Sequence, residues 1–350
     1  MKNMKKLLAL FVTVFFACAI VLTGCGAAEA TTEEVSDANQ TEQGTEDGTT
    51  VQGVKVRIGS LKGPTSIGLV SLMDKADKGE TTNQYEFQME AAADGLIAGI
   101  MKGDLDIALI PANAASIWYN KMEGAVKVLD INTLGVLYMV SKDESLTTIE
   151  SLKGKTITLT GKGNTPDYTL QYLLKENGLT TDDVTLEYKS EAAEVVSALS
   201  AGQADIGLLP QPFVTAACAQ NDQLQVVMDM TEQWNQVQGE SGSQLVTGVT
   251  IVRKEFLEAN KEAVDIFMKE QQESVKAVNE NVSEAAALVA ELGIIEKAAL
   301  AEKAIPQCNI TYMAGDEMKE ALQGYLTVLY ELDKTMVGGK LPADDFYYMP

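Results

Sequence analysis

Short apolar runs typical of β-strands alternate with segments of helical spacing along most of the chain. Strand-like runs cover residues 54–59 and 156–160, and two further runs end at Pro111 and Pro210. Each run lies beside a segment whose apolar residues recur every three or four positions, as on one face of a helix. Strands that alternate with helices form parallel sheets with helices on both faces, so the pattern predicts an α/β fold.

A weak internal repeat indicates that the chain contains two such units. The sequence Gly-Asp-Leu-Asp-Ile-Ala-Leu-Ile-Pro at residues 103–111 corresponds to Gly-Gln-Ala-Asp-Ile-Gly-Leu-Leu-Pro at residues 202–210. Upstream, Lys-Gly-Pro-Thr at residues 62–65 corresponds to Lys-Gly-Asn-Thr at residues 162–165, each between a strand and a helix. A repeat at an offset of about 100 residues predicts two similar α/β lobes.

The remaining segments set the boundaries of the two lobes. Two apolar, strand-like stretches at residues 133–140 and 244–252 are expected to cross between the lobes as a pair of hinge strands. Lobe 2 then comprises residues 141–243, and lobe 1 comprises residues 54–132 together with residues 253–350. We expect lobe 1 to be completed by helices in the segments 255–279, 283–292, 296–304 and 316–334.

The predicted topology also indicates where a ligand would bind. In open parallel sheets, ligands lie at the carboxyl ends of the strands, where helix N-termini present free backbone amides. Two lobes that face each other through these strand ends would enclose one cleft.

The N-terminus has the pattern of a lipoprotein signal peptide. Three lysines within the first six residues precede an apolar run at residues 7–22, which leads into Leu-Thr-Gly-Cys at residues 22–25. An uncleaved membrane anchor would need about 20 apolar residues, which is more than this run supplies. We therefore predict that residues 1–24 are removed and that Cys25 becomes the lipid-bearing first residue, on the extracytoplasmic face of the cell membrane.

The segment that follows, residues 25–53, is predicted to be a flexible acidic tether. It carries seven acidic side chains, no basic residue and no aromatic residue, so it cannot bury a core of its own. Loss of the signal peptide would change the formal net charge from −23 to −26. A surface this acidic disfavours binding to nucleic acid or anionic lipid.

Several kinds of chemistry are disfavoured by the composition. The chain contains no histidine, which removes His-based catalytic triads, most zinc sites and the commonest general base. We therefore expect no enzymatic activity, no cofactor and no metal. For Asp104 and Asp106, at the start of a strand, solvated or capping roles are sufficient. After signal cleavage and lipidation, Cys218 and Cys308 remain, and we expect two buried thiols in different lobes rather than a disulfide.

Taken together, these features resemble a known family. The lipobox, the acidic tether, the opening strand Val-Arg-Ile-Gly at residues 56–59 and the repeated Gly-x-x-Asp-Ile strand are similar to solute-binding proteins of ABC importers. Within this family, the chain resembles the group that binds nitrate, sulfonates, taurine and thiamine precursors, namely the NMT1/THI5-like and SsuA-like proteins. The resemblance implies the type II periplasmic binding protein fold, and a monomer that closes on a small solute and delivers it to a permease and its ATPase subunits.

The same resemblance implies candidate binding residues in four loops, at residues 60–65, 111–113, 161–165 and 210–213. Hydroxyl groups beside helix N-termini and two side-chain amides would read polar groups of the solute. The loop candidates are Ser60, Lys62, Gly63, Thr65, Asn113, Gly161, Lys162, Asn164, Thr165, Gln211 and Phe213.

Aromatic and basic residues leave the nature of the solute open. Trp118 and Trp234, the only tryptophans, would stack on a flat ligand or serve in packing. Lys62 and Lys162 would neutralise an anion or remain exposed at the surface. The two arginines lie outside the loops, so a bidentate clamp on an anion is unsupported. We expect a sulfonate- or nitrate-type anion or a pyrimidine- or vitamin-precursor-type ring. Alternatives are an enzyme on the same fold and a surface adhesin or signalling lipoprotein.

Overall fold

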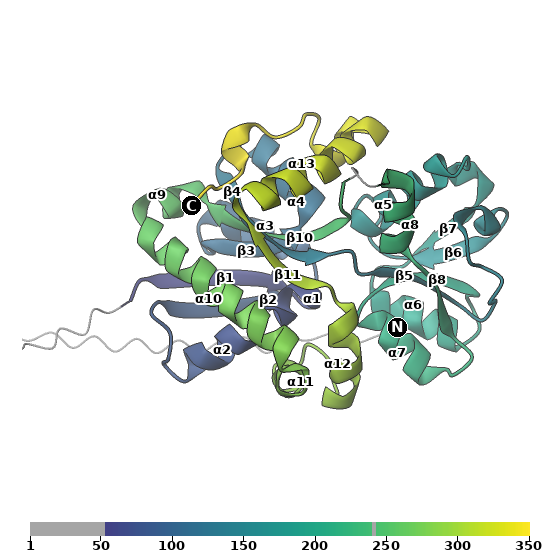
Figure 1. Cartoon of the computed structure of the whole chain (residues 1–350), viewed down its shortest axis with the longest axis horizontal. Helices are drawn as coiled ribbons and strands as arrows, with labels where there is room; N and C mark the ends of the chain where they lie inside the picture. The colour runs from purple at the N-terminus through teal and green to yellow at the C-terminus, as the bar shows by residue number, and fades with distance from the viewer. Residues whose placement is uncertain (1–52, 240–242) are drawn as a thin grey trace, which may run out of the picture. The chain divides into compact units, whose positions relative to one another are not determined.

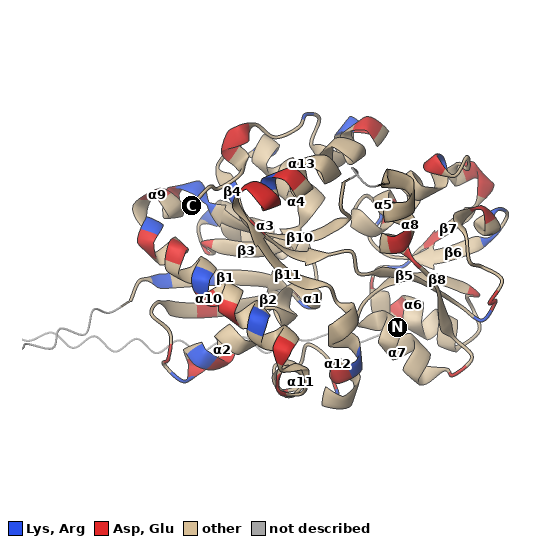
Figure 2. Cartoon of the chain, in the orientation of Figure 1, with Lys and Arg blue, Asp and Glu red and all other residues tan. Residues whose placement is uncertain are grey.

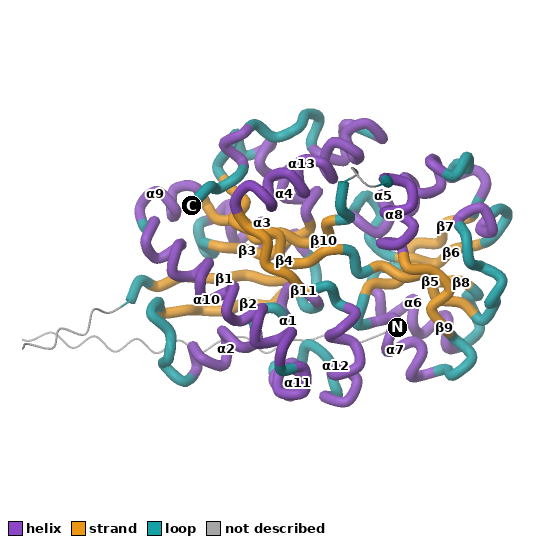
Figure 3. Tube along the Cα trace, viewed as in Figure 1, coloured by secondary structure: helices purple, strands orange, loops and turns teal. Residues whose placement is uncertain are grey.

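The computed structural model describes residues 53–239 and 243–350. Cys25, the predicted signal peptide and nearly all of the predicted tether lie outside the described residues. Within the described part, the strands form two separate sheets that are covered by helices (Figures 1 and 3). We refer to the six-stranded sheet and its helices as lobe 1, and to the five-stranded sheet and its helices as lobe 2.

The sheet of lobe 1 has the strand order β11-β4-β10-β3-β1-β2. Strands β2, β1 and β3 are parallel, whereas β10 runs antiparallel to both of its neighbours and β11 runs antiparallel to β4. Its strands are β1 (Lys55–Leu61), β2 (Gln84–Glu90), β3 (Ile107–Pro111), β4 (Val126–Leu134), β10 (Val246–Arg253) and β11 (Ile310–Ala314).

The sheet of lobe 2 repeats this arrangement with the order β7-β6-β8-β5-β9. Strands β7, β6 and β8 are parallel, and β5 runs antiparallel to β8 and β9. Its strands are β5 (Leu137–Ser141), β6 (Thr156–Leu159), β7 (Thr185–Tyr188), β8 (Ile206–Pro210) and β9 (Gln225–Asp229).

The internal repeat therefore corresponds to a repeated strand order. In each lobe, three parallel strands are followed by an antiparallel strand, β10 or β5, which enters from the other lobe. Pro111 pairs with Gly248 of β10, and Pro210 pairs with Leu137 of β5. The parallel strands expected from the sequence are present, but each sheet also contains antiparallel pairs, because each crossover strand enters its sheet from the opposite direction.

The first predicted hinge strand, residues 133–140, is divided in the structure. Strand β4 ends at Leu134 in lobe 1, and β5 begins at Leu137 in lobe 2. Gly135 lies between them, and a Cβ atom at this position would be 2.1 Å from Thr231 Oγ1. Only glycine allows the chain to pass this close to its neighbour at the crossover.

The helices cover both sheets and leave their charged residues on the outer surface, notably along α2 and α10 (Figure 2). In lobe 1 they are α1 (Pro64–Ile67), α2 (Val70–Asp77), α3 (Ala93–Lys102), α4 (Ala112–Lys121), α9 (Lys254–Ala259), α10 (Lys261–Glu280), α11 (Val282–Glu291), α12 (Ala298–Ala304) and α13 (Gly315–Leu332). In lobe 2 they are α5 (Thr165–Glu176), α6 (Ala192–Ser200), α7 (Phe213–Gln220) and α8 (Met230–Gln238). Short 3-10 turns are η1 (Ile149–Leu152), η2 (Thr181–Asp183), η3 (Ile305–Gln307), η4 (Lys334–Val337) and η5 (Asp344–Phe346).

The helix predicted over residues 255–279 is two helices. Asn260 interrupts it with φ −137° and ψ 43°, outside the helical region, and its Nδ2 donates to the carbonyl of Phe256 at 3.2 Å. An asparagine that bonds to nearby backbone competes with the helix in this way. The longer helix α10 is amphipathic and buries Val264, Phe267 and Val275 against lobe 1.

Asp106 is buried, contrary to the expected solvated or capping role. Arg57 Nη2 donates to its Oδ1 at 2.6 Å, and Arg253 Nη2 donates to the same oxygen at 3.1 Å. The antiparallel β10 brings Arg253 to this position, where its backbone N–H also donates to the Asp106 carbonyl at 2.9 Å. Both arginines of the chain are therefore used in a structural ion pair.

The cysteines in the described residues are both free. Cys308 is buried in lobe 1, as expected, whereas Cys218 on α7 of lobe 2 is only half-buried. Among the described residues, we find no helix with the length and apolar character needed to cross a membrane.

Candidate ligand-binding site

Two predicted site residues meet at the boundary between the lobes. Asn113 lies in the first turn of α4, immediately after β3 of lobe 1, and Thr165 begins α5 of lobe 2. Both side chains are buried, and Thr165 Oγ1 donates to Asn113 Oδ1 over a long 3.4 Å. The carboxyl ends of the parallel strands thus direct two helix N-termini toward the same place, as the topology predicted.

Two further buried polar residues belong to this place and were not expected from the sequence. Tyr325 of α13 is fully buried, and its hydroxyl lies beside that of Thr165. Burial raises the pKa of Tyr325, so this hydroxyl keeps its proton. Thr169 is fully buried one turn after Thr165, on the same face of α5. We call Asn113, Thr165, Thr169 and Tyr325 the central polar group.

Three atoms of the central polar group have no hydrogen-bond partner within residues 53–239 and 243–350. They are Asn113 Nδ2, Thr169 Oγ1 and Tyr325 Oη. Buried polar atoms in proteins are almost always hydrogen-bonded, and each one without a partner requires an explanation. Asn113 and Tyr325 of lobe 1 both lie beside Thr165 of lobe 2, one helical turn before Thr169, so a molecule bound at this boundary would supply the missing partners.

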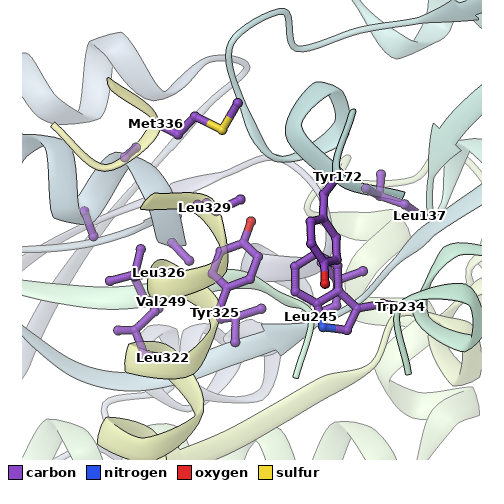
Figure 4. Packing of buried hydrophobic residues seen from close by; sticks show 14 of the residues in the cluster. Leu137, Tyr172, Trp234, Leu245, Val249, Leu322, Tyr325, Leu326, Leu329 and Met336 are labelled. Atoms are coloured by element: carbon purple, nitrogen blue, oxygen red, sulfur yellow. The ribbon is translucent and has the colours of Figure 1, made fainter. Parts of the chain in front are cut away.

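Trp234 borders the central polar group from lobe 2. Its ring centroid lies 4.6 Å from that of Tyr172 on α5 and 5.7 Å from that of Tyr325 on α13. Figure 4 shows these three rings side by side, with Leu245 and Val249 among the apolar residues around them. Trp234 is fully buried, and its Nε1 donates to the Ser243 carbonyl at 2.7 Å. Its main observed role is packing between the lobes, which places an apolar wall beside the central polar group.

Trp118 is not brought to the central polar group. It follows Asn113 by five residues on α4, which turns it about 140° around the helix axis. Its ring lies 4.9 Å from the ammonium group of Lys121. The tryptophan therefore faces away from the boundary that Asn113 faces.

In the loop after β1, the candidate side chains mainly bond to each other and to the backbone. Thr65 Oγ1 donates to the Leu61 carbonyl at 2.9 Å, and Ser60 Oγ lies 2.6 Å from Ser66 Oγ. Gly63 has a φ of 153°, which favours glycine, and Lys62 is exposed. The structure thus gives this loop a stable internal hydrogen-bond network.

The loop after β6 leads into a buried acidic residue, Asp167, that the sequence analysis did not identify as a site residue. Gly161 has a φ of 71°, and Asn164 and Lys162 are exposed. Asp167, in the first turn of α5, is buried and accepts from Gly163 N at 2.8 Å. The sequence could have pointed to Asp167, because an acidic residue at the third position of a helix complements the positive N-terminal end of the helix dipole.

Gln211 and Phe213 lie in two neighbouring grooves between the lobes. Gln211 Oε1 accepts from Thr215 Oγ1 at 2.8 Å, and the residue lines a groove of about 460 Å³ with Lys303 of α12. Phe213 lines a groove of about 280 Å³ with Leu300 of α12. Phe213 begins α7 and Gln211 lies two residues before it, apart from the contacts that define the central polar group.

Comparison with known proteins agrees with this fold. The model of the NMT1/THI5-like family matches residues 120–285. The chain is similar to a crystal structure of an ABC transporter protein from Parabacteroides distasonis, with 23% identity, 85% of this chain and 99% of that chain covered, and a TM-score of 0.70. It is similar to the periplasmic aliphatic sulphonate binding protein SsuA from Escherichia coli, with 16% identity, 85% and 92% coverage and a TM-score of 0.67.

A third similar structure is the periplasmic nitrate-binding protein NrtA from Synechocystis, with 13% identity, 83% of each chain covered and a TM-score of 0.60. The resemblance inferred from the sequence is confirmed. So is the fold class, the two-lobed periplasmic binding protein fold. Among curated proteins, none matches the sequence.

The arginines and the two candidate lysines lie apart from the central polar group. Both arginines bind Asp106 at the start of β3, about 17 Å along the strand from its other end. Lys62 and Lys162 are exposed, and the Lys162 ammonium lies 5.3 Å from the ring centroid of Tyr188. Thus none of the predicted basic residues contacts the central polar group.

Proposed function

We propose that this protein is the substrate-binding lipoprotein of an ABC importer. It captures a small organic solute between its lobes and delivers the solute to a permease with its ATPase subunits. The observation that carries the proposal is the central polar group, in which both lobes contribute buried atoms that have no hydrogen-bond partner in the described part of the chain. The similarity in fold to a periplasmic sulphonate-binding protein and a periplasmic nitrate-binding protein supports it.

The geometry explains how solute binding would act on the lobes. Asn113 and Tyr325 belong to lobe 1, whereas Thr165 and Thr169 belong to lobe 2. A solute that bonds to both pairs stabilises the arrangement in which the lobes touch. When the lobes are apart, the solute cannot form hydrogen bonds to both pairs at once. A ligand shifts a conformational equilibrium by this difference in affinity, so the solute itself would drive closure.

The proposed location follows from the N-terminal sequence. Acyl chains on Cys25 would hold the protein at the extracytoplasmic face of the cell membrane, and residues 26–53 would let the lobes reach the permease. We propose that the protein acts as a monomer and has no catalytic residues, cofactor or metal. Capture and release of an unchanged solute require none of them.

The proposal is tested by thermal unfolding of the purified mature protein in the presence of sulfonates, nitrate, pyrimidines, vitamins and amino acids. At least one solute is expected to raise the melting temperature, because it binds only the folded state. Asn113→Ala and Thr165→Ala should abolish that shift, whereas Thr185→Ala, an exposed threonine on β7 of the same lobe as Thr165, should preserve it. A protein that responds to no solute in the library contradicts the proposal.

A further inference from the structure

Asp167 places a buried negative charge at the N-terminus of α5. Its Oδ2 accepts from Gly163 N at 2.8 Å, and its Oδ1 accepts from Tyr188 Oη at 2.8 Å and from Gln171 Nε2 at 2.7 Å. All three partners donate, so both oxygens act as the acceptors of a carboxylate. Burial is the larger cause, and the hydrogen bond to Asp167 the smaller, of a raised pKa for Tyr188. The phenol therefore keeps its proton and remains a donor.

This charge changes what the α5 N-terminus can bind. A helix N-terminus carries roughly half a positive charge, which would normally attract an anion. The full negative charge of Asp167 exceeds that half charge, and Asp167 shares the first helical turn with Thr165. An anion in contact with Thr165 would therefore meet a net negative potential at the N-terminus of α5.

Among the described residues, no observed contact joins a basic group to the central polar group to compensate for that potential. Arg57 and Arg253 are bound to Asp106 at the far end of β3. Lys162 is the nearest candidate in sequence, but its ammonium group lies over the ring of Tyr188 and the residue is exposed to solvent, where its field is weakened.

The atoms without partners indicate the complementary groups on the solute. Asn113 Oδ1 already accepts from Thr165, which leaves the amide nitrogen Nδ2 as a pure donor. The hydroxyls of Thr169 and Tyr325 also have protons to donate. A solute that satisfies all three presents hydrogen-bond acceptors, such as carbonyl, sulfonyl or ring nitrogen atoms, and its flat surface would fit beside Trp234 and Tyr325.

We propose that Asp167 is a specificity-determining residue that restricts the central polar group to uncharged, acceptor-bearing solutes and excludes sulfonate and nitrate anions. The inference rests on the proposed function and narrows its substrate class. It assigns this chain a preference opposite to that suggested by the names of the sulfonate- and nitrate-binding proteins that share its fold.

The test measures binding of matched neutral and anionic probes by calorimetry. Suitable pairs are benzamide with benzoate, benzenesulfonamide with benzenesulfonate, and pyrimidine-5-carboxamide with its carboxylate. The wild-type protein should bind the neutral member of a pair and bind its anion at least about tenfold more weakly. Asp167→Asn, which removes the charge at nearly constant size, should bring the two affinities to within about threefold of each other.

Glu176→Gln is the matched control, because it also removes one negative charge from α5 but lies exposed at the C-terminal end of the helix. It should leave both affinities and their ratio unchanged. Wild-type protein that binds an anion as tightly as its neutral partner overturns the inference while leaving the proposed function intact. So does an Asp167→Asn variant that folds and keeps the wild-type ratio. If that variant does not fold, the wild-type ratios alone decide. If neither member of any pair binds, the inference is refuted, and the broad solute screen then decides the proposed function separately.

Discussion

Asp130 gives the sharpest prediction for stability. It lies on β4, between β11 and β10 of the lobe 1 sheet, and is completely buried. Its Oδ1 accepts from Thr250 Oγ1 at 2.8 Å and from Gln271 Nε2 at 3.1 Å. Its Oδ2 and Gln271 Oε1 are buried acceptors without partners within the described residues. We predict that Asp130→Asn stabilises the protein above neutral pH, because the amide adds a donor and carries no charge.

The magnitude follows from the titration of this carboxyl group. Burial raises the pKa of Asp130 from 3.8 to about 7, and the bonds from Thr250 and Gln271 oppose that shift only in part. Because the folded-state pKa lies above the unfolded one, the folded state holds the extra proton between these values. Stability from this group is fully present below about pH 4 and is lost as pH rises through about 7. A shift of about three units corresponds to roughly 4 kcal/mol.

The assay is urea unfolding of wild-type protein and Asp130→Asn at pH 5 and pH 8. The variant should gain about 2–4 kcal/mol relative to wild type at pH 8, and about 2–3 kcal/mol less than that at pH 5, where the native carboxyl group is already protonated. Asp222→Asn, at an exposed turn, is the control and should change neither value. An Asp130→Asn variant that is less stable than wild type at pH 8, or whose gain is equal at both pH values, would refute the reasoning.

Three further predictions concern the boundary between the lobes and the membrane anchor. Tyr325→Phe removes a buried hydroxyl that has no hydrogen-bond partner among the described residues, so urea unfolding without ligand should show no loss of stability beyond about 1 kcal/mol. Calorimetry should show at least about tenfold weaker solute binding. Gly135→Ala places a methyl group 2.1 Å from Thr231 Oγ1 and should lower the free energy of unfolding by about 1–3 kcal/mol. Cys25→Ala should leave solute affinity in calorimetry unchanged and should reduce solute uptake by cells, because it removes only the proposed anchor.

Much of the fold could be predicted because it is encoded by local patterns. The prolines that end β3 and β8 occupy equivalent positions in the repeat, so the correspondence between the lobes was visible before any pairing was known. Strand direction was predicted less well. β10 pairs antiparallel with β3, and β5 pairs antiparallel with β8. These directions depend on how the chain crosses between the lobes, which local sequence patterns do not indicate.

The site could be predicted only in part for the same reason. Asn113 lies two residues after β3, and Thr165 begins the helix that follows β6, so both could be predicted from the rule that ligands bind at the carboxyl ends of parallel strands. Tyr325 enters the central polar group from α13, far away in the sequence, and only tertiary packing brings it there. Asp106 was misjudged because its partner Arg253 lies 147 positions later in the chain.

The energetics of the central polar group show why a solute would control the contact between lobes. Each buried polar atom without a partner costs about 1–3 kcal/mol, so Asn113 Nδ2, Thr169 Oγ1 and Tyr325 Oη together oppose contact by several kcal/mol. Separation of the lobes would return these atoms to water, and a bound solute would satisfy them without separation. A shift from 1:99 to 99:1 in a two-state equilibrium needs about 5.5 kcal/mol of differential binding. Three restored hydrogen bonds are of that size, so the same atoms that recognise the solute are sufficient to make closure depend on it.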